Sequence, residues 1–579
     1  MNRALPLTAF AVLCILRPGL RGPKPEPLSP ERAVATLMPA GCRVYLEGPG
    51  LEPLVRGGLA HPFLATARAT PFARALEDAG GSLEQALERA DAWLGAPVLP
   101  LAARMTQRGI ALGFDPEHDA GLLVAVAIDA SAAEEGLATL LAALERQHGV
   151  PGALRGAHAR WDEAEVWFLG EEVVLARRGE LLVAGKRRED VRAVLALAAD
   201  PGARGMLARP DLQAQREARA TDAVLWGWLA LEELEAFGDE GLRALRRVGL
   251  TPAGQGLLGA ELAALCGARA LALSLVLAGD RPELRVRALG ASRVESLAPG
   301  ARQAEQPAEV TGEDLGSALL YRDYARFLAG RATLFPAEAQ ASFAETITTG
   351  ALFFAGRDLG NEVLPHVSPW IRLVAREVEF PSERRPEITL PAVAAIAVLD
   401  DPAEGEAWRS ALQTLIAILG IEQAQKGRAG LGLHLSSVGA IELTSARFPA
   451  PRPGEGVDLR HNLEPAMAIV GRHLIVGSHV GLVRELALEL EGATPLATPA
   501  PEELRIAPRA LAPLLSRNRP ALVAHKMLTE GLAHEDALRE IVGLECLLES
   551  LESVRIEVGR PAPDVHELVL APVLAVAPR

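Results

Sequence analysis

Apolar and polar positions follow one pattern at two places in the chain. In Glu165–Ala198, two short apolar runs flank a polar turn at Gly179, and apolar residues at helical spacing follow them. In Ala466–Leu490, the same pattern has its turn at Gly471. Each stretch predicts a strand, a turn, a second strand and then a helix. Because glycines punctuate structure at turns, their recurrence favours two diverged copies of one unit.

Other similar segments occur in the same order in both halves. They are the blocks Gly95–Pro100 and Gly360–Pro365, the strands Leu122–Asp129 and Ala394–Asp400, and the strand-to-helix segments around Tyr45 and Tyr321. Shorter segments of the last kind lie at Trp226 and Leu504, and we expect Tyr45, Tyr321 and Trp226 each to end a strand. The pattern predicts a tandem duplication.

The expected fold class is α+β, a tandem duplication of a larger mixed α/β unit followed by a smaller one, with antiparallel hairpins covered by amphipathic helices. The expected domains are large and small units at 31–215 and 216–294, a polar linker at 295–316, and a second large and small pair at 317–500 and 501–579. Length alone requires more than one core.

Two long helices are expected to follow the paired strands, at Ala132–Gln147 and Glu404–Leu419. Ser131 with Glu134, and Asp401 with Glu404, have the spacing of capping boxes, in which side chains satisfy the first free amides of a helix. Helix capping therefore accounts for these acids.

The N-terminus carries an apolar run, Ala4–Leu16, between Arg3 and Arg17, and a Pro-rich spacer follows to Pro30. We interpret residues 1–30 as a secretory signal peptide or a short uncleaved anchor, because the run suits export and is too short for an ordinary transmembrane helix. The expected location is the periplasm or envelope, with membrane contact only through this segment.

Composition narrows the classes of ligand. The 579-residue chain has a formal net charge of -15, and 4% of its residues are aromatic. Nucleic acid is therefore excluded as the main ligand, because phosphates require basic side chains and bases stack on rings. The lysines are Lys24, Lys186, Lys426 and Lys526, which leaves few candidates for lysine chemistry.

The cysteines Cys14, Cys42, Cys266 and Cys546 show neither CxxC nor metal-ligand spacing. Buried thiols are favoured over a disulfide framework. One disulfide among Cys42, Cys266 and Cys546 stays open as an alternative.

Histidines are densest at His461, His473 and His479. Their positions in a strand and the following loop favour exposed or half-buried side chains over a metal site. His525 and His534 are expected on different turns of one helix. No metal or cofactor site is predicted from these groups.

Three further candidates have ordinary explanations. Gly254–Gly259 fits GxGxxG, but no buried strand precedes it, so a Gly-rich turn is favoured over a dinucleotide site. Asp400 and Asp401 would act with His434 as acid and base only if folding joined them. A basic cluster that could attract an anionic lipid or polymer is interpreted as a solvated turn, since the second copy lacks it: Arg177, Arg178, Lys186, Arg187 and Arg188.

The strand ending in an aromatic, the GxxVLP block and above all LLVAGKRREDVRAVL resemble a family of uncharacterised bacterial exported repeat proteins, a domain of unknown function. The similarity covers most of the chain from about Arg43 onwards. Membership would imply an extracytoplasmic location and an α+β repeat architecture. It brings no established activity, cofactor or catalytic residue.

The function expected from these observations is non-enzymatic, an exported binding or scaffold protein of the bacterial cell envelope. Its partner would be an unidentified protein or small ligand, bound in a groove between duplicated halves. Two alternatives stay open. One is an enzyme whose site is assembled from distant residues of one half, and the other is a lipid or lipoprotein carrier with an apolar cavity.

Overall fold

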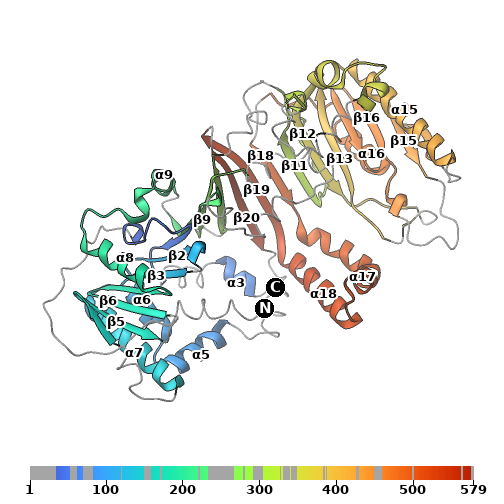
Figure 1. The fold of residues 1–579 in the computed structure, drawn as a ribbon. Helices are drawn as coiled ribbons and strands as arrows, with labels where there is room; N and C mark the ends of the chain where they lie inside the picture. Colours follow the sequence, from blue (N-terminus) through green and yellow to red (C-terminus); the bar gives the residue numbers. More distant parts are fainter. Residues whose placement is uncertain are drawn as a thin grey trace. The chain divides into compact units, whose positions relative to one another are not determined.

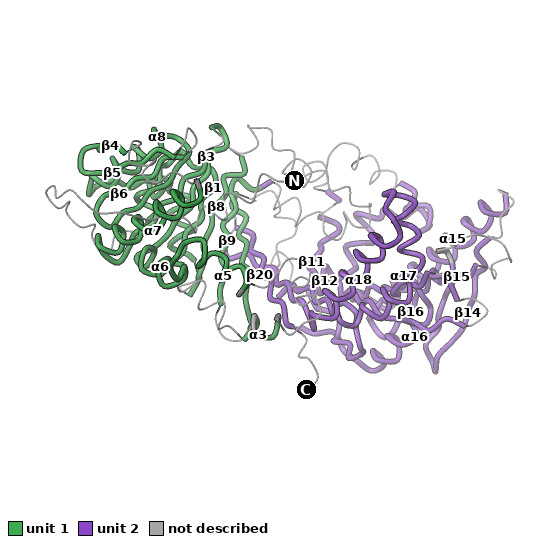
Figure 2. The backbone as a smooth tube through the Cα atoms, turned by 90° about the horizontal axis from the view of Figure 1, so that it is seen from below, with its two compact units in different colours: residues 1–69, 73–245, 268–290 green, residues 70–72, 246–267, 291–579 purple. Residues whose placement is uncertain are grey.

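The computed structural model describes residues 34–51, 62–68, 83–118, 120–148, 158–169, 173–219, 222–232, 267–277, 281–290, 304–326, 328–329, 340, 348–381, 385–386, 388–425, 430–448, 459–497, 501–562 and 565–574 (Figure 1). The chain divides into two compact units (Figure 2). Unit 1 comprises residues 1–69, 73–245 and 268–290, and unit 2 comprises residues 70–72, 246–267 and 291–579. The predicted signal or anchor at residues 1–30 lies outside the described residues.

Unit 1 is built on antiparallel strands. They are β1 (Val44–Gly48), β2 (Ile110–Asp115), β3 (Ala120–Val126), β4 (His158–Trp161), β5 (Ala164–Leu169), β6 (Val173–Arg178), β7 (Leu181–Gly185), β8 (Ala223–Leu229), β9 (Ala270–Val276) and β10 (Glu283–Leu289). They pair in the order β4-β5-β6-β7-β3-β2-β1-β8-β9-β10. The β1–β8 pairing makes the sheet continuous across the predicted boundary between the large and small units.

Helices cover both faces of this sheet. The helices of unit 1 are η1 (Val34–Thr36), α3 (Pro62–Arg68), α5 (Leu83–Leu94), α6 (Val98–Thr106), η2 (Pro116–His118), α7 (Ala130–His148), α8 (Arg188–Ala199), η4 (Gly205–Ala208) and α9 (Pro210–Glu217). On one face, Leu137 of α7 packs in a core with Leu175 and Leu182. On the other, Gly185 lets Val191 of α8 approach, because a Cβ there would lie 3.0 Å from its methyl group.

Unit 2 has the strands β11 (Gly316–Tyr321), β12 (Val367–Arg376), β13 (Ala392–Leu399), β14 (Gly432–Val438), β15 (Ile441–Arg447), β16 (Ala466–Val470), β17 (His473–Gly477), β18 (Glu502–Ile506), β19 (Leu551–Ala562) and β20 (Val565–Leu574). They pair antiparallel in the order β14-β15-β16-β17-β13-β12-β11-β18-β19-β20. This order matches that of unit 1 strand by strand. The predicted α+β class with antiparallel strands is thus observed.

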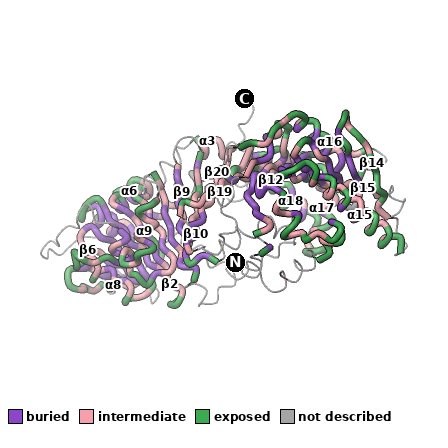
Figure 3. The backbone as a smooth tube through the Cα atoms, turned by 90° about the horizontal axis from the view of Figure 1, so that it is seen from above, coloured by how far each residue is buried: buried purple, intermediate pink, exposed green. Residues whose placement is uncertain are grey.

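The helices of unit 2 are the π-helix η6 (Leu359–Val363), η7 (Leu364–His366), α15 (Glu404–Gln425), η9 (Leu459–Asn462), α16 (Val480–Glu489), α17 (Pro508–Glu530) and α18 (His534–Ser550). Trp408 of α15 packs on Leu474 on one face of the sheet. Leu482 and Leu486 of α16 are fully buried on the other. Each such leucine contributes roughly 1.5–3 kcal/mol by leaving water. Buried and exposed residues alternate along this helix (Figure 3). None of the described helices is both long and apolar enough to span a membrane.

The two stretches with one apolar pattern fold as predicted, each into a hairpin followed by a helix. In unit 1, β6 and β7 meet at Gly179 (φ 59°), and α8 follows. In unit 2, β16 and β17 meet at Gly471 (φ 57°), and α16 follows. A left-handed backbone at the turn favours glycine, which explains why this residue recurs.

Both long helices begin with an aspartate cap. Asp129 Oδ1 accepts a hydrogen bond from the amide of Ala132 at 2.7 Å, and Asp401 Oδ1 accepts one from the amide of Ala403 at 2.9 Å. The capping role of Asp401 is confirmed, whereas Asp129 has the role predicted for Ser131. The predicted capping boxes do not form, because Glu134 binds Arg177 and Glu404 binds Arg357 instead. Such a cap stabilises a helix by roughly 1 kcal/mol.

The three aromatic residues do not share one place in their strands. Tyr321 is the last residue of β11, as predicted, but Tyr45 is the second residue of β1 and Trp226 lies inside β8. Their common property is burial, and the rings of Tyr45 and Trp226 meet edge to face with centroids 6.1 Å apart. The prediction is wrong for these two because a buried ring packs equally well inside a strand.

The described part of the predicted linker, residues 304–316, packs on unit 2. Gln306 is fully buried and exchanges two backbone hydrogen bonds with Leu496, at 2.8 and 2.9 Å. Asp314 binds the guanidinium of Arg376, with Nε and Oδ1 2.7 Å apart. These contacts make the segment a strap on the α16 face of the sheet, where Ala308 joins the core.

Candidate functional site

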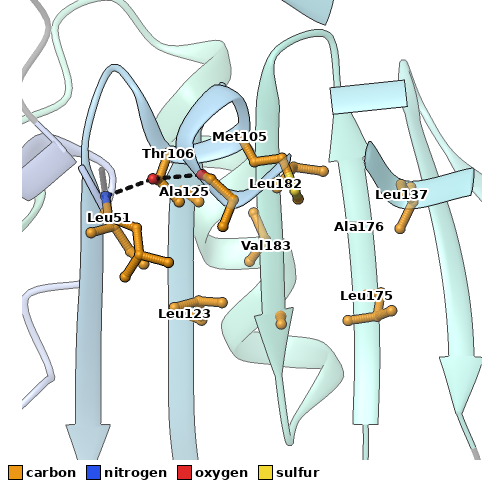
Figure 4. A pocket seen from close by; sticks show the side chains of 13 residues that line it. Leu51, Met105, Thr106, Leu123, Ala125, Leu137, Leu175, Ala176, Leu182 and Val183 are labelled. Atoms are coloured by element: carbon orange, nitrogen blue, oxygen red, sulfur yellow. Dashed lines mark hydrogen bonds between the residues drawn. The ribbon is translucent and has the colours of Figure 1, made fainter. Parts of the chain in front are cut away.

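A cavity lies between the sheet of unit 1 and helices α6 and α7 (Figure 4). Its volume is about 30 Å³, which is roughly the share of one water molecule in the liquid. The walls are Leu51, Ala102, Met105, Thr106, Ile110, Leu123, Ala125, Leu137, Leu175, Ala176, Leu182, Val183 and Ala184. A space of this size holds one methyl-sized group unless its walls move.

The one hydroxyl among the lining side chains is already engaged. Thr106 Oγ1 accepts a hydrogen bond from the amide of Leu51 at 2.7 Å and donates to the carbonyl of Ala102 at 2.9 Å (Figure 4). The other lining side chains are apolar. The cavity therefore offers an apolar contact surface and no side-chain group that would orient a polar ligand.

The corresponding layer of unit 2 is filled by aromatic rings. Phe354 and Trp408 meet edge to face, with centroids 5.0 Å apart and planes at 79°. Phe354 packs with Val363, and Trp408 also reaches Leu474. Counted from the capping aspartates, Trp408 corresponds to Gly136 of α7, one residue before Leu137. Aliphatic side chains leave space in unit 1 where rings occupy it in unit 2.

Two of the three candidate histidines share a small hollow in unit 2. His461 and His479 line it together with Phe380, Pro381, Phe448, Leu463 and Glu464, around a volume of about 20 Å³. Glu464 Oε1 binds Arg447 Nε at 2.9 Å, and Glu464 Oε2 lies 3.9 Å from His479 Nε2. Two imidazoles and a carboxylate thus lie together, but His479 and Glu464 are beyond hydrogen-bond distance of each other.

His479 has a structural role as the N-cap of α16. Its Nδ1 accepts a hydrogen bond from the amide of Gly481 at 3.1 Å, and its ring meets Phe380 edge to face at 5.2 Å. Burial lowers the pKa of His479, opposed by the charge of Glu464 and aided by Arg447. A neutral ring with Nδ1 as acceptor carries its proton on Nε2, so protonation of Nδ1 would break the cap.

His473 does not belong to this hollow. It is fully buried near the start of β17, where Nε2 accepts a hydrogen bond from the amide of Ala308 in the strap at 3.3 Å. Burial and Arg472 lower the pKa of His473, and the Val470 carbonyl opposes them. The expected exposed or half-buried state is wrong for His473 and His479, because strap and helix cap enclose their rings; it holds for His461.

Asp400 and His434 are far apart. Asp400 follows β13 and lies 3.9 Å from His366, with both side chains about half exposed, whereas His434 is exposed on β14. The order β13-β17-β16-β15-β14 separates them by four strand spacings, or roughly 19 Å. With Asp401 serving as a cap, the structure brings no acid–base set together from these residues.

The basic cluster is only partly a turn. Arg177 belongs to β6 and binds Glu165 at 2.5 Å and Glu134 at 3.1 Å, and Arg178 binds Glu163 at 2.9 Å. The interpretation as a solvated turn is wrong for these two arginines, because acids across the sheet and on α7 neutralise them. Arg188 stacks on Phe168 at 4.4 Å from the ring centroid.

The remaining predicted candidates are two histidines, the cysteines and the segment Gly254–Gly259. His525 lies in α17 and His534 begins α18, so the expected single helix is wrong; Gly531 (φ 69°) ends the first of them. Cys42 and Cys546 are free thiols, and burial raises the pKa of Cys42 to about 12. Cys266 and Gly254–Gly259 lie outside the described residues.

Two buried carboxylates were not recognised in the sequence. Glu502 binds Arg322 at 2.8 Å, with 2% and 0% of the side chains exposed. Glu47 accepts a hydrogen bond from Arg216 Nε at 2.6 Å and one from the hydroxyl of Tyr45 at 2.7 Å. No sequence signal links the carboxylates to their arginines, because they meet only when distant strands and helices pack.

Asp115, Glu117 and His118 form a small polar cluster that short spacing in the sequence would have revealed. Their ligand atoms all lie within 4.8 Å of one another, and His118 Nδ1 is 2.7 Å from Asp115 Oδ2. In this part of the described chain, Asp190 also approaches, and burial raises its pKa, with the charge of Asp115 contributing. The set could hold a cation, but it is mostly exposed and nothing else marks it as a site.

No family model and no curated protein matches the chain. Two solved structures, described as "Structure of crystal form I of TP0453" and "Structure of crystal form IV of TP0453", match with TM-scores of 0.23 and 0.22 at 8% identity. They cover 47% and 46% of this chain and 81% of their own. The resemblance to exported repeat proteins stays a prediction.

Proposed function

We propose that this chain is a non-enzymatic binding or scaffold protein of the bacterial cell envelope, exported through its N-terminal segment and built by tandem duplication. The observation that carries the duplication is the order of ten antiparallel strands, which is the same in both units; the export part of the proposal is based on the apolar run Ala4–Leu16. Register supports it as well. Leu122 in β3 and Ala394 in β13 each face the last glycine of the hairpin, Gly185 or Gly477.

The roles of the candidate polar groups favour binding over catalysis. Asp401 and His479 cap helices, His473 fastens the strap, and Arg177 neutralises acids on its own unit. Each group is committed to the fold, so recruiting it for proton transfer would cost stability. Binding through an outer surface requires no such change.

The enzyme alternative would place its chemistry in the hollow of His461, Glu464 and His479. It would require His479 to exchange its helix cap for a substrate proton. The carrier alternative would use the apolar cavity of unit 1, but about 30 Å³ is far below the roughly 150 Å³ that accommodates benzene in an engineered cavity. The hollow would therefore have to lose its helix cap to act as an active site, and the cavity would have to expand to carry a lipid.

Cell fractionation tests the proposal directly. The full chain, expressed in a Gram-negative bacterium, is expected in the periplasmic or membrane fraction and accessible to protease after the outer membrane is opened. Leu13→Glu places a charge in the apolar run and should retain the protein in the cytoplasm. Recovery of the unaltered chain wholly in the cytoplasm would contradict the envelope location.

Binding and catalysis are separated by a second measurement. His479→Asn keeps a capping side chain, since asparagine is a strong N-cap, but removes the imidazole. If the hollow is structural, the variant should keep every measured interaction of the unaltered chain and lose only the stability that the contact between the His479 ring and Phe380 supplies. A hydrolytic activity of the purified protein that this variant loses would replace the scaffold proposal with the enzyme alternative.

A further inference from the structure

The strap, residues 304–316, covers the α16 face of the sheet of unit 2, where Ala308 joins the apolar core. Two of its backbone amides donate to side chains beneath it. The amide of Ala308 donates to His473 Nε2 at 3.3 Å, and the amide of Thr311 donates to Glu489 Oε2 at 2.9 Å. Titratable side chains therefore hold the middle of the strap, whereas backbone hydrogen bonds hold its two ends.

Residues 34–42 cover the corresponding face of the sheet of unit 1. Met38 lies so close to Gly113 of β2 that a Cβ on this glycine would collide with its sulfur atom. Gly113 and Gly185 both lie opposite Leu122 of β3, so Met38 is on the same face as α8, which packs at Gly185. This segment is anchored by buried apolar side chains, namely Val34, Leu37 and Met38.

The anchors of the strap occupy positions at which unit 1 has leucines. His473 and Leu181 are each the first residue of the second hairpin strand, β17 or β7. Glu489 and Leu197 lie in the following helix, at equal distances from the valine that packs on the hairpin glycine. The fold therefore does not require titratable groups at these positions, and in unit 2 they make the attachment of the strap dependent on pH.

His473 holds the strap only while its ring is neutral. Because Nε2 accepts the hydrogen bond from Ala308, the single proton of the neutral ring is on Nδ1. A second proton would go to Nε2, where it would face the N–H group of Ala308, and two donors form no hydrogen bond with each other. Protonation therefore breaks this contact and drives the strap away from the ring.

The surroundings of His473 disfavour a positive charge. The ring is fully buried, and the neighbouring strands place Val398 and Val470 opposite it. Arg472 precedes it in the chain and binds Glu305 of the strap at 2.5 Å, so this carboxylate is already paired. Because a buried charge is costly, the charged ring is stable only when the strap leaves and water reaches it.

We propose that the strap is an acid-released cover, which protonation of His473 detaches from the α16 face while the sheet and α16 of unit 2 stay folded. In the closed state seen here, burial lowers the pKa of His473, the Val470 carbonyl opposes this and Arg472 adds to it. When the strap is released, water reaches the ring and its pKa returns toward about 6.5. The released state therefore binds the proton first, so release is favoured as the pH falls below about 6.5.

Charged groups at the other end of the strap titrate at lower pH. Arg376 binds Asp314 with Nε and Oδ1 2.7 Å apart, and it also binds Glu489. Burial raises the pKa of Glu489, but Arg376 and two strap amides lower it to below its ordinary value, so this anchor is lost only below about pH 4.5. Burial raises the pKa of Asp314 despite the hydrogen bond from Arg376, so acid favours the closed state through this group. Release above that pH therefore depends on His473.

Hydrogen–deuterium exchange of the full chain, followed by mass spectrometry, tests the proposal. Protection factors, corrected for the intrinsic exchange rate at each pH, are compared for the strap and for the hairpin β16–β17 beneath it. Between pH 7.5 and pH 5.0 the protection of the strap should fall roughly threefold to thirtyfold, since release takes up one proton below a pKa of about 6.5. At pH 5.0 the hairpin should remain at least about tenfold better protected than the strap, because local release leaves it folded. Residues 34–42 of unit 1 are the internal control and should show no comparable loss.

Two variants assign the effect to one ring. His473→Gln places an amide oxygen near the position of Nε2, so the strap keeps an acceptor that does not titrate. In this variant the fall in protection between pH 7.5 and pH 5.0 should disappear. His434→Gln is the matched control, because His434 is exposed on β14 and its replacement should leave the pH profile of the strap unchanged. Equal unfolding midpoints at pH 7.5 would show that both variants fold.

Three results would overturn the proposal. The first is constant protection of the strap between pH 7.5 and pH 5.0 in the unaltered chain. The second is equal protection of strap and hairpin at pH 5.0, since unit 2 would then open as a whole. The third is an undiminished effect of acid in His473→Gln. The first two comparisons need no variant and hold even if His473→Gln fails to fold, and all three are independent of where in the cell the protein resides.

Discussion

Units 1 and 2 have the same strand order, but they differ in the side chains that pack between sheet and helices and in those along the outer edge of the sheet. Between the sheet and its helices, unit 1 has a cavity beside Leu137, whereas unit 2 has the rings of Trp408 and Phe354. At the outer edge, unit 1 protects β4 with His158 stacked on Trp167, and unit 2 leaves Leu435 exposed. Backbone pairing and turn glycines are shared, while side chains that fill a layer or cover an edge vary.

The comparison indicates which parts of a unit can vary while the strand order stays the same. Strand order depends on hydrogen bonding and on a few turn positions, so it tolerates exchange of side chains in the layers above. A buried ion pair is less tolerant, because its partners must be exchanged together. The units also differ here, since both partners are buried in Arg322–Glu502 but Arg216 and Arg219 of the Glu47 cluster are 21% and 35% exposed.

The largest effect is expected from Arg322→Leu in unit 2. It leaves Glu502 buried with Arg560 at 3.5 Å as its remaining cationic neighbour among the described residues, and loss of one partner of a buried pair costs roughly 3–5 kcal/mol. Arg216→Leu in unit 1 should cost about 1–2 kcal/mol, because Arg219 and solvent still serve Glu47. Denaturant unfolding measures both. Equal losses of stability would show that the difference in burial between the two clusters has no energetic effect.

Acid should destabilise the fold through a histidine beside the same ion pair. Burial, and then the charges of Arg560 and Arg322, lower the pKa of His566 to about 4. The unfolded state, with a pKa near 6.5, binds the proton first, so stability is lost as the pH falls from about 6.5 to about 4, by roughly 3 kcal/mol.

His566→Phe removes this titration, so the loss of stability between pH 7 and pH 4 should be smaller than in the unaltered chain. Unfolding at pH 8, where the histidine is neutral in both states, gives the reference for each protein. An unchanged slope in the variant would mean that His566 titrates alike in both states.

The smallest effect concerns the cavity. Leu137→Phe puts a ring beside the cavity, and filling about 30 Å³ should stabilise unit 1 by at most ~0.7 kcal/mol. Leu140→Phe on the same helix is the control, because Leu140 is buried in the core but does not line the cavity, and overpacking there should cost about 1–3 kcal/mol. If both variants lose stability alike in thermal unfolding, the cavity is not usable space.

Local structure was predictable from the sequence wherever apolar spacing and glycine act together. The hairpins at Gly179 and Gly471, their following helices and the cap at Asp401 are found where predicted. These features depend on neighbouring residues, which one stretch of sequence contains. The duplication itself remains our proposal.

Features that depend on distant contacts were not predictable. Strand β14 has leucines on an exposed face, so burial could not mark it as a strand. Glu502 and Arg322 are far apart in sequence and meet through β18 and the end of β11. The hollow at His479 likewise needs Phe380, which lies on another segment of the unit. Partners of this kind become visible only when strands are paired and helices are docked.

The strap has a consequence for dissecting the chain. A fragment of unit 2 that begins at residue 317, immediately inside the first strand, would lack Gln306, Ala308 and Asp314. It would expose the apolar α16 face, leave His473 without its amide donor and take an acid from Arg376. The folding unit therefore begins upstream of its first strand, and limited proteolysis at neutral pH should spare residues 304–316 while unit 2 stays folded.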